Sequence, residues 1–409
     1  GVTVKVDTFH RAVEISRGYR ARGVPVVWGG IYPTACPDDC AAHADAVVIG
    51  EAETIWPRLL EDVRGGRLRR EYRNGGPVDL ARSPVPRWDL LRAGRYLFTN
   101  TIIAGRGCPW RCDFCYNSSP NVDARHRMKP VANILAEIRS LDAPHVMFID
   151  DNFIGDPDGA RALMAALAPL RLTWHCAASA DIGRREDLLD RMAETGCKSL
   201  FIGFETINSE NLRRCRKTRN RVADYEATIA RIQERGLMVN ASLVFGFDGD
   251  DESVFPATLD WLVRNRVATM TAHILTPYPG TRLHAQLGRT GRMVDRDLRR
   301  YDTAHVVFTP RGMSAAALER GHRWMYRQFY SWPNILRRMP SERHARIAYL
   351  EFNLLYRKYG KLTCGLGRLF GMRRLAKFAK ALAYPPARAG RNTAAAPAAA
   401  ALQAGEPCP

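Results

Sequence analysis

Three closely spaced cysteines are the residues whose chemistry is easiest to interpret. Cys108, Cys112 and Cys115 are separated by three and two residues, so their thiolates could surround one inorganic centre. Iron–sulfur cubanes usually take four cysteine ligands, and structural zinc sites also close at four. The local set stops at three, and the next cysteine, Cys176, lies far along the chain. The spacing favours an iron–sulfur cubane with one iron free for another ligand, and it leaves zinc or a chance cluster as alternatives.

The triplet follows the first strand of a regular α/β series. Predicted strands lie at Thr101–Ala104, His145–Ile149, Thr173–Ala178, Ser199–Phe204, Val239–Phe245 and Thr271–Leu275. Helical patterns separate them at Val131–Leu141, Asp158–Leu170, Arg185–Thr195, Val222–Arg235 and Glu252–Asn265. Alternation without hairpin signals predicts a parallel sheet, either open or curled into a partial barrel. Chemistry is then expected at the carboxyl ends of the strands.

The motif Cys-x-x-x-Cys-x-aromatic-Cys after such a first strand resembles the radical S-adenosylmethionine superfamily. The resemblance covers residues 99–285 and implies a partial, TIM-like (β/α)6 barrel. It also implies a [4Fe–4S] cluster on the three cysteines, with S-adenosylmethionine chelating the fourth iron. One electron, from a donor such as flavodoxin or ferredoxin, would then release a 5′-deoxyadenosyl radical.

The resemblance assigns further residues at successive strand ends. Phe114, which precedes the last cysteine, would meet the adenine through its backbone, and Asp150 and Asp151 end the second strand near the methionine amino group. Taken singly, each position has a structural explanation, such as a helix cap at an aspartate. Their regular placement favours a shared site. The remaining candidates are Ser179 after the third strand, Glu205 in a Gly-x-Glu element at the fourth, and Phe245 at the fifth, beside the adenine.

Residues 1–70 predict a smaller α/β domain, with strands at 2–6, 24–28 and 45–49 and helices at 10–22 and 55–63. This pattern is half of a doubly wound, Rossmann-like fold. Gly29 and Gly30 end one of its strands, where missing Cβ atoms let a ligand approach the backbone. The segments 26–34 and 44–53 resemble the last part of the cobalamin-binding domain that precedes many radical enzymes. In that family the glycine pair lies beside the nucleotide tail of cobalamin.

The cobalamin-like domain is expected to be incomplete. The sequence begins at Gly1 without Met, and it lacks the Asp-x-His-x-x-Gly segment that supplies a histidine ligand in some members. Either that segment lies upstream of this sequence, or the cobalt has no histidine ligand. His10 and His43 do not lie in the required context. Cobalamin is therefore expected as an additional cofactor, with only part of its pocket present.

The rest of the chain is predicted from its composition. Residues 71–98, rich in Gly, Arg and Pro, predict a linker, and residues 286–385 predict a basic, mostly helical extension. Residues 386–409 predict a disordered tail because they are almost only Ala, Pro and Gly. Tyr278–Thr281 and Phe329–Trp332 resemble a branch of cobalamin-type radical enzymes that includes relatives of hopanoid C-3 methylase.

Composition excludes several classes of protein. The 409 residues are 46% hydrophobic and 25% charged, as in an ordinary globular protein. No apolar run approaches the roughly 20 residues of a membrane-spanning helix, and no export signal is visible, so a cytoplasmic location is expected. The net charge is +19. The basic amphipathic stretch at 335–382 predicts peripheral contact with the inner face of an anionic membrane, or alternatively a helix packed on its own barrel.

The function expected from these features is a radical enzyme that transfers a methyl group from cobalamin to a carbon of a lipid-like or other small-molecule substrate. A radical cyclase or rearrangement enzyme with the same domains is the first alternative. A metal-binding protein attached to nucleic acid is the second. The charged residues of this sequence are spread along the chain, and no RNA-binding motif is apparent. No nucleic-acid partner is therefore expected.

Overall fold

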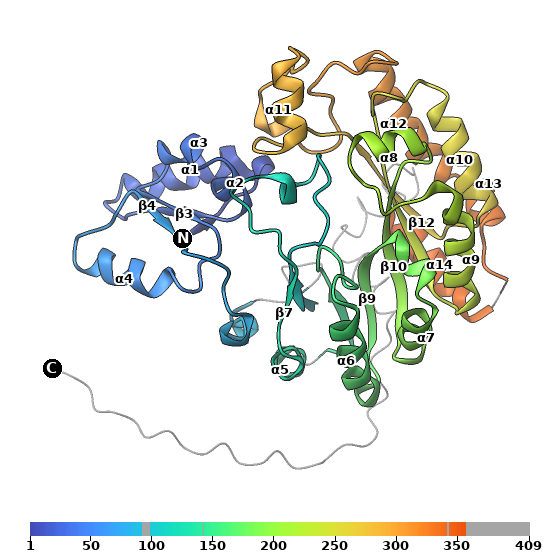
Figure 1. Cartoon of the computed structure of the whole chain (residues 1–409), viewed down its shortest axis with the longest axis horizontal. Coiled ribbons are helices and arrows are strands. Elements are labelled where there is room, and N and C mark those ends of the chain that lie inside the picture. The colour runs from blue at the N-terminus through green and yellow to red at the C-terminus, as the bar shows by residue number, and fades with distance from the viewer. Residues whose placement is uncertain (92–98, 142, 342, 357–409) are drawn as a thin grey trace, which may run out of the picture.

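The computed structural model describes residues 1–91, 99–141, 143–341 and 343–356. The basic stretch beyond residue 356 and the predicted tail lie outside the described residues. In the described part, the chain forms a four-stranded sheet, a six-stranded sheet and a two-stranded ribbon. Figure 1 shows the first sheet and its helices on the left, and the larger sheet with its helices in the centre and on the right.

The larger sheet is entirely parallel, and its strands lie side by side in chain order. This order follows from one helical crossover between successive strands, and it brings all carboxyl ends to one edge. The predicted parallel sheet is therefore confirmed. Its strands are β5 (Thr101–Ile102), β8 (His145–Phe148), β9 (Thr173–Ser179), β10 (Cys197–Glu205), β11 (Met238–Phe245) and β12 (Thr269–Ile274).

Amphipathic helices cover one face of this sheet. In α6 (Pro157–Leu167), the buried residues Ala160, Leu163, Met164 and Leu167 recur at helical spacing and join the main core. Figure 1 shows α6 and its successors following one another along the outer side of the sheet. The others are α5 (Val131–Ser140), α7 (Glu186–Glu194), α8 (Ser209–Arg214), α9 (Tyr225–Glu234) and α10 (Val254–Arg264).

The first sheet has four parallel strands, β1 (Val2–Thr3), β2 (Val27–Gly29), β3 (Ala46–Ile49) and β4 (Glu71–Arg73). The prediction of a linker from residue 71 is wrong at its start, because β4 pairs with β3. Only Tyr72 of this strand is buried, and three residues show no periodicity that would reveal a strand. The helices of this region are α1 (Phe9–Arg20), α2 (Ile31–Ala35), α3 (Pro37–Ala41) and α4 (Trp56–Arg64).

The helical extension closes the exposed edge of β12. Tyr330 donates its hydroxyl to Met270 O at 2.6 Å and accepts Met270 N–H at 3.0 Å, so it replaces a neighbouring strand. The buried Arg338 guanidinium donates to the carbonyls of Val267 and Ala268. No described helix has the length and apolar character needed to cross a membrane. Helix α11 (Arg282–Arg289) spans the start of the extension, and α12 (Ala315–Phe329), α13 (Trp332–Arg337) and α14 (Arg343–Tyr356) lie within it.

Replacing Tyr330 by Phe should destabilise the larger domain. The change leaves the main-chain N–H and C=O of Met270 without this partner, which costs about 1–3 kcal/mol of unfolding free energy. Urea unfolding of Tyr330→Phe measures the loss. The matched control is Tyr19→Phe, at a residue 54% exposed on α1. Equal unfolding midpoints for the two variants would contradict the edge-capping role.

Candidate functional site

The cysteine triplet lies on a loop just beyond β5. The loop joins β6 (Gly105–Arg106) to β7 (Arg127–Met128), an antiparallel ribbon with two residues in each strand. Gly107 opens the loop with φ +80°, and a Cβ there would lie 2.8 Å from Ala124 O. Only glycine fits this turn. Cys108 N–H then donates to Ala124 O at 3.1 Å, which draws the two ends of the loop together.

Cys112 is buried, Cys108 and Cys115 are half-buried, and the three thiols lie near one another. Burial raises the pKa of Cys108, Cys112 and Cys115 to about 11, and each thiol also raises the pKa of another member of the triplet. Main-chain hydrogen bonds act in the opposite direction: Trp110 lowers the pKa of Cys108, and Asn117 lowers the pKa of Cys115, so both favour the thiolate. A cation bound by these thiols would supply the remaining stabilisation. The loop therefore fits a metal centre that requires thiolate ligands.

The arrangement distinguishes between kinds of metal centre. All eight cysteines in the described part of the chain are free. Among the described residues, no three His, Cys, Asp or Glu side chains converge on a single metal ion. A structural zinc site takes four ligands, and the loop offers three thiols, whereas a cubane can bind three thiolates through three different irons.

The two nominated aspartates have different surroundings. Asp150 is buried, and its carboxylate accepts the N–H groups of Ala104, at 3.1 Å, and of Gly105. Burial raises the pKa of Asp150 to about 6. Both oxygens are taken by the main chain, so Asp150 anchors the start of the loop. Asp151 is exposed and lies close enough to Cys108 and Cys115 to raise the pKa of both thiols.

Ser179, at the end of β9, is fixed by a neighbour that was not nominated from the sequence. Asn152 is buried, and its Oδ1 accepts the N–H of Ser179 at 3.2 Å. The Ser179 hydroxyl donates to Asp181. Asn152 directly follows the two aspartates at the end of β8. This position in the sequence could have identified it as a residue of the site.

Glu205 ends β10 in a strained conformation beside the triplet. Its φ is +66°, and the strand register shifts between Gly203 and Glu205. Its carboxylate forms an ion pair with Lys217, which has 15% of its side chain exposed. Burial lowers the pKa of Lys217, but Glu205 and Cys112 outweigh it and the net pKa is raised. Lys217 also acts to lower the pKa of all three thiols of the triplet. A cation that was not predicted from the sequence therefore lies beside them.

Two buried side chains hold this unusual strand end. Asn220 donates from Nδ2 to Gly203 O at 2.8 Å, and the Tyr225 hydroxyl donates to Phe204 O at 2.8 Å. A non-glycine residue at positive φ persists only when its surroundings determine the conformation. The hydrogen bonds from Asn220 and Tyr225 therefore hold the strand end in the conformation that gives Glu205 its positive φ.

The aromatic candidates do not all approach the loop. Phe114 lies 6.3 Å from Phe247 in an edge-to-face contact. Phe245 instead packs against Phe255 of α10, at 5.0 Å, within the core. β11 ends at Phe245, and Gly246 turns the chain with φ +101°, so Phe247 no longer follows the strand. The nominated Phe245 therefore lies on the helix side, and Phe247 takes its place beside the loop.

The first domain meets the cysteine loop at Tyr116. The ring of Tyr116 stacks on Tyr278 at 5.3 Å, and its hydroxyl is buried without a hydrogen-bond partner among the described residues. Burial, followed by Cys36 of the first domain, raises the pKa of Tyr116. A buried hydroxyl without a partner is unfavourable, and a ligand between the domains would relieve it. This orphaned group fits a cofactor held between the first domain and the loop.

The nominated glycines contribute to the turn after β2. Gly30 has φ +103°, and a Cβ there would lie 2.9 Å from the Thr3 side chain. At Gly29 a Cβ would meet only Val48, at an ordinary 3.6 Å. Gly30 is therefore required by the fold itself, while Gly29 leaves room at the strand end.

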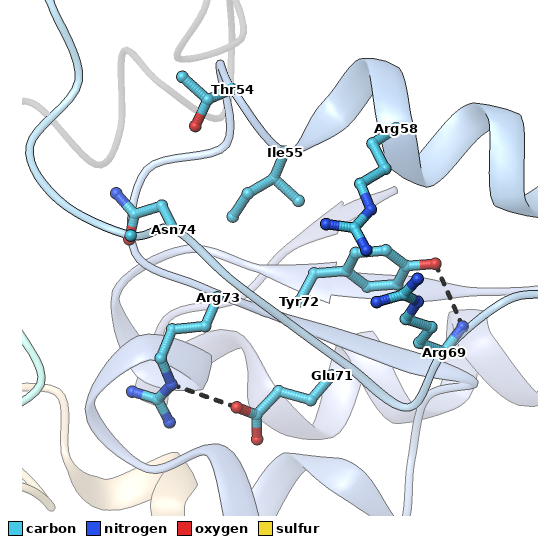
Figure 2. Close-up of a pocket in the computed structure, with 9 residues that line it drawn as sticks. Thr54, Ile55, Arg58, Arg69, Glu71, Tyr72, Arg73 and Asn74 are labelled. Carbon is cyan, nitrogen blue, oxygen red and sulfur yellow. Dashed lines mark hydrogen bonds and ion pairs between the residues drawn. The ribbon is translucent and has the colours of Figure 1, made fainter.

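A cavity of about 300 Å³ lies elsewhere on the first domain, between α4 and β4. Figure 2 shows Arg58 and Arg69 beside Tyr72, and Arg73 paired to Glu71. Arg69, another lining residue, lies 3.5 Å from Asp62. None of the predicted site residues lines this cavity, so it is separate from the cysteine loop.

Comparison with known proteins identifies the larger domain. Residues 102–262 match the family model described as the radical SAM superfamily. Bacteriochlorophyllide d C-12(1)-methyltransferase of Chlorobaculum tepidum is 28% identical over 88% of this chain and 81% of its own length. Hopanoid C-3 methylase of Methylococcus capsulatus is 26% identical over 65% of this chain, which spans only 54% of that protein.

The fold also resembles a solved structure along most of the chain. TsrM of Kitasatospora setae, a radical S-adenosylmethionine methyltransferase solved with cobalamin and a [4Fe–4S] cluster, superposes with a TM-score of 0.60. The match covers 92% of this chain and 88% of TsrM at 18% identity, so it concerns the fold alone. Together with the matched residues and the geometry of the cysteine loop, these likenesses show that the chain carries a radical S-adenosylmethionine domain.

Proposed function

We propose that this chain is a cobalamin-dependent radical S-adenosylmethionine enzyme that methylates a carbon of a lipid-like or other largely apolar small molecule. The cysteine loop carries the proposal, because it combines three ligand thiols with one pair of opposite charges, Glu205 and Lys217, beside them. When bound, the cluster supplies the electron that cleaves S-adenosylmethionine, and cobalamin supplies the methyl group.

The proposed roles of the protein groups follow from their positions. Cys108, Cys112 and Cys115 hold the cluster, and the chain offers no fourth cysteine within the loop. Glu205 and Lys217 orient S-adenosylmethionine through opposite charges, while Asp151 faces its amino group. Phe114 and Phe247 flank the adenine. A flavodoxin or ferredoxin supplies the electron.

The architecture proposed here is a partial (β/α)6 barrel preceded by part of a Rossmann-like cobalamin domain. The sequential order of the six parallel strands supports the first, and Gly29, Gly30 and the orphaned Tyr116 hydroxyl support the second. Residues 1–70 would contribute one wall of the cobalamin pocket and residues 99–285 the other.

Exposed apolar side chains favour an apolar substrate. Ile103, Ile149 and Phe201 are 38%, 49% and 36% exposed, although they lie on or beside the larger sheet. Each alternates with buried neighbours of the helix-covered core, so all three belong to the opposite face of the sheet. Two related enzymes are named as methylating a bacteriochlorophyllide and a hopanoid. We infer a substrate with an extensive hydrocarbon or macrocyclic surface.

Product analysis tests methylation against a cyclase or rearrangement. The chain is reconstituted anaerobically with iron, sulfide and cobalamin, then reduced in the presence of S-adenosylmethionine. Methylation predicts that S-adenosylhomocysteine accumulates together with 5′-deoxyadenosine, because one cofactor molecule gives the methyl group and another gives the radical. Release of 5′-deoxyadenosine alone would support a rearrangement, and a colourless zinc protein would refute both.

Removing one thiol of the triplet should abolish the cluster. Cys112→Ala leaves only two local ligands, so iron, sulfide and visible absorbance should fall to background after reconstitution. The matched control is Cys197→Ala, since Cys197 is also buried but lies in β10. Equal iron and sulfide contents in the two variants would contradict the assignment of the triplet.

The charge of Glu205 should contribute to cofactor affinity. Glu205→Gln keeps the shape but removes the negative charge, and it should weaken S-adenosylmethionine binding roughly tenfold, ~1.4 kcal/mol. Equilibrium binding to the reconstituted protein measures the effect. Glu210→Gln is the control, because Glu210 is a 42% exposed carboxylate in the following helix. An unchanged dissociation constant for Glu205→Gln would remove this residue from the site.

The C-terminal extension is proposed to contact anionic membranes. Leu336 and Ile347 are 60% and 63% exposed and belong to the basic helices α13 and α14. Deleting residues 335–409 would be a poor test, because it removes the buried Arg338 and Tyr349 that hold β12. Substitution of the two exposed residues leaves the packing intact.

Co-sedimentation with phosphatidylserine-containing vesicles tests this surface. The variant Leu336→Gln with Ile347→Gln should bind several-fold less than the parent, because burial of each side chain contributes about 1–2 kcal/mol. Val294→Gln is the matched control, at a residue 61% exposed outside α13 and α14. Equal recovery of all three proteins with the vesicles would rule out the membrane contact.

A further inference from the structure

The ribbon that carries the cysteine loop has an unfavourable feature of its own. Arg106 on β6 and Arg127 on β7 are directly paired across its two strands. Like charges opposite one another destabilise a strand pair, and a ribbon of two residues per strand has little else to hold it. The loop therefore needs an external anion if both ends are to stay in register.

The first domain supplies that anion through Glu51. Its Oε1 accepts from Arg106 at 2.9 Å and from Arg127 at 3.0 Å, and its Oε2 accepts a second bond from Arg127 at 2.8 Å. Glu53 pairs with Arg106 as well. The four side chains are 18–30% exposed, so water screens them only in part. Two carboxylates thus balance two guanidinium groups at the junction of the domains.

Glu51 is itself held firmly. It directly follows Gly50 at the end of β3, and Gly50 has φ +89°. Its Oε2 also accepts the N–H of Val78 at 3.1 Å, and Arg127 donates to Val78 O at 3.0 Å. The Glu51 carboxylate therefore accepts a hydrogen bond from the main chain of Val78 and binds the arginine of each ribbon strand.

We propose that Glu51 is a positioning residue for the cysteine loop, through which the first domain sets the geometry of the radical centre. This inference rests on the proposed function only in taking the loop as the cluster-binding element. Charge-assisted hydrogen bonds of this kind are worth more than neutral ones and constrain direction as well as distance. Changes at the end of β3, where the first domain would hold its ligand, reach the loop through Glu51.

Hydrogen exchange on the full chain tests the proposal before any cofactor is added. Glu51→Gln should speed exchange of the amides in 105–128 about tenfold or more, while the two sheets keep their protection. The control Glu71→Gln removes a neighbouring exposed ion pair, Glu71 with Arg73, and should leave this segment unchanged. Unchanged exchange in Glu51→Gln, or faster exchange throughout the chain, would overturn the proposal.

Rescue and spectroscopy separate positioning from a merely structural role. Glu51→Asp should recover part of the protection, and adding Arg127→Gln to Glu51→Gln should have little further effect, because the two groups act together. In the reconstituted protein, Glu51→Gln should shift the paramagnetic resonance spectrum of the reduced cluster without reducing its iron content. An identical spectrum would overturn the role at the radical centre. Failure of the parent chain to assemble a cluster would refute the proposed function, while the exchange comparison would still decide the role of Glu51.

Discussion

The arrangement of the radical centre depends on one buried carboxylate. Asp150, at the end of β8, accepts the N–H groups of Ala104 and Gly105 at the point where the chain leaves β5 and enters the cysteine ribbon. Without this partner, two buried main-chain donors would lose their hydrogen bonds. Because Asp150 belongs to the neighbouring strand, the origin of the loop is tied to the sheet. The thiols can then take a defined position above the strand ends.

Buried polar side chains also bind the main chain at the other strand ends. Asn152 holds the end of β9 through Ser179, Asn220 holds the end of β10, and Asp250 accepts the N–H groups of Gly246 and Phe247 after β11. Each is a buried polar side chain that forms hydrogen bonds with the main chain. Together they make the edge of the sheet rigid enough to keep Glu205 at positive φ beside Lys217, as a preorganised site requires.

The sequence predicted more of the fold than of the site. The long strands and helices could be predicted because each buries one face. Strand β4 was not predicted, because only Tyr72 of its three residues is buried. The end of β11 was predicted correctly at Phe245, but the turn at Gly246 that brings Phe247 beside the loop was not predicted. Asp150 and Asp151 looked equivalent in the chain and differ only through tertiary contacts. Lys217 and Glu51 act across long sequence separations, which no local pattern reveals.

We propose that the three cysteines would hold a cubane whose fourth iron is free to bind S-adenosylmethionine. Electron paramagnetic resonance of the reduced, reconstituted chain tests this most directly, with S-adenosylmethionine labelled with ¹⁷O at its carboxylate and ¹⁵N at its amino group. Chelation of the fourth iron predicts a cubane signal that changes when the cofactor is added and shows hyperfine coupling to both labels. A cubane signal without coupling to either label, or the absence of any cubane signal, would contradict it.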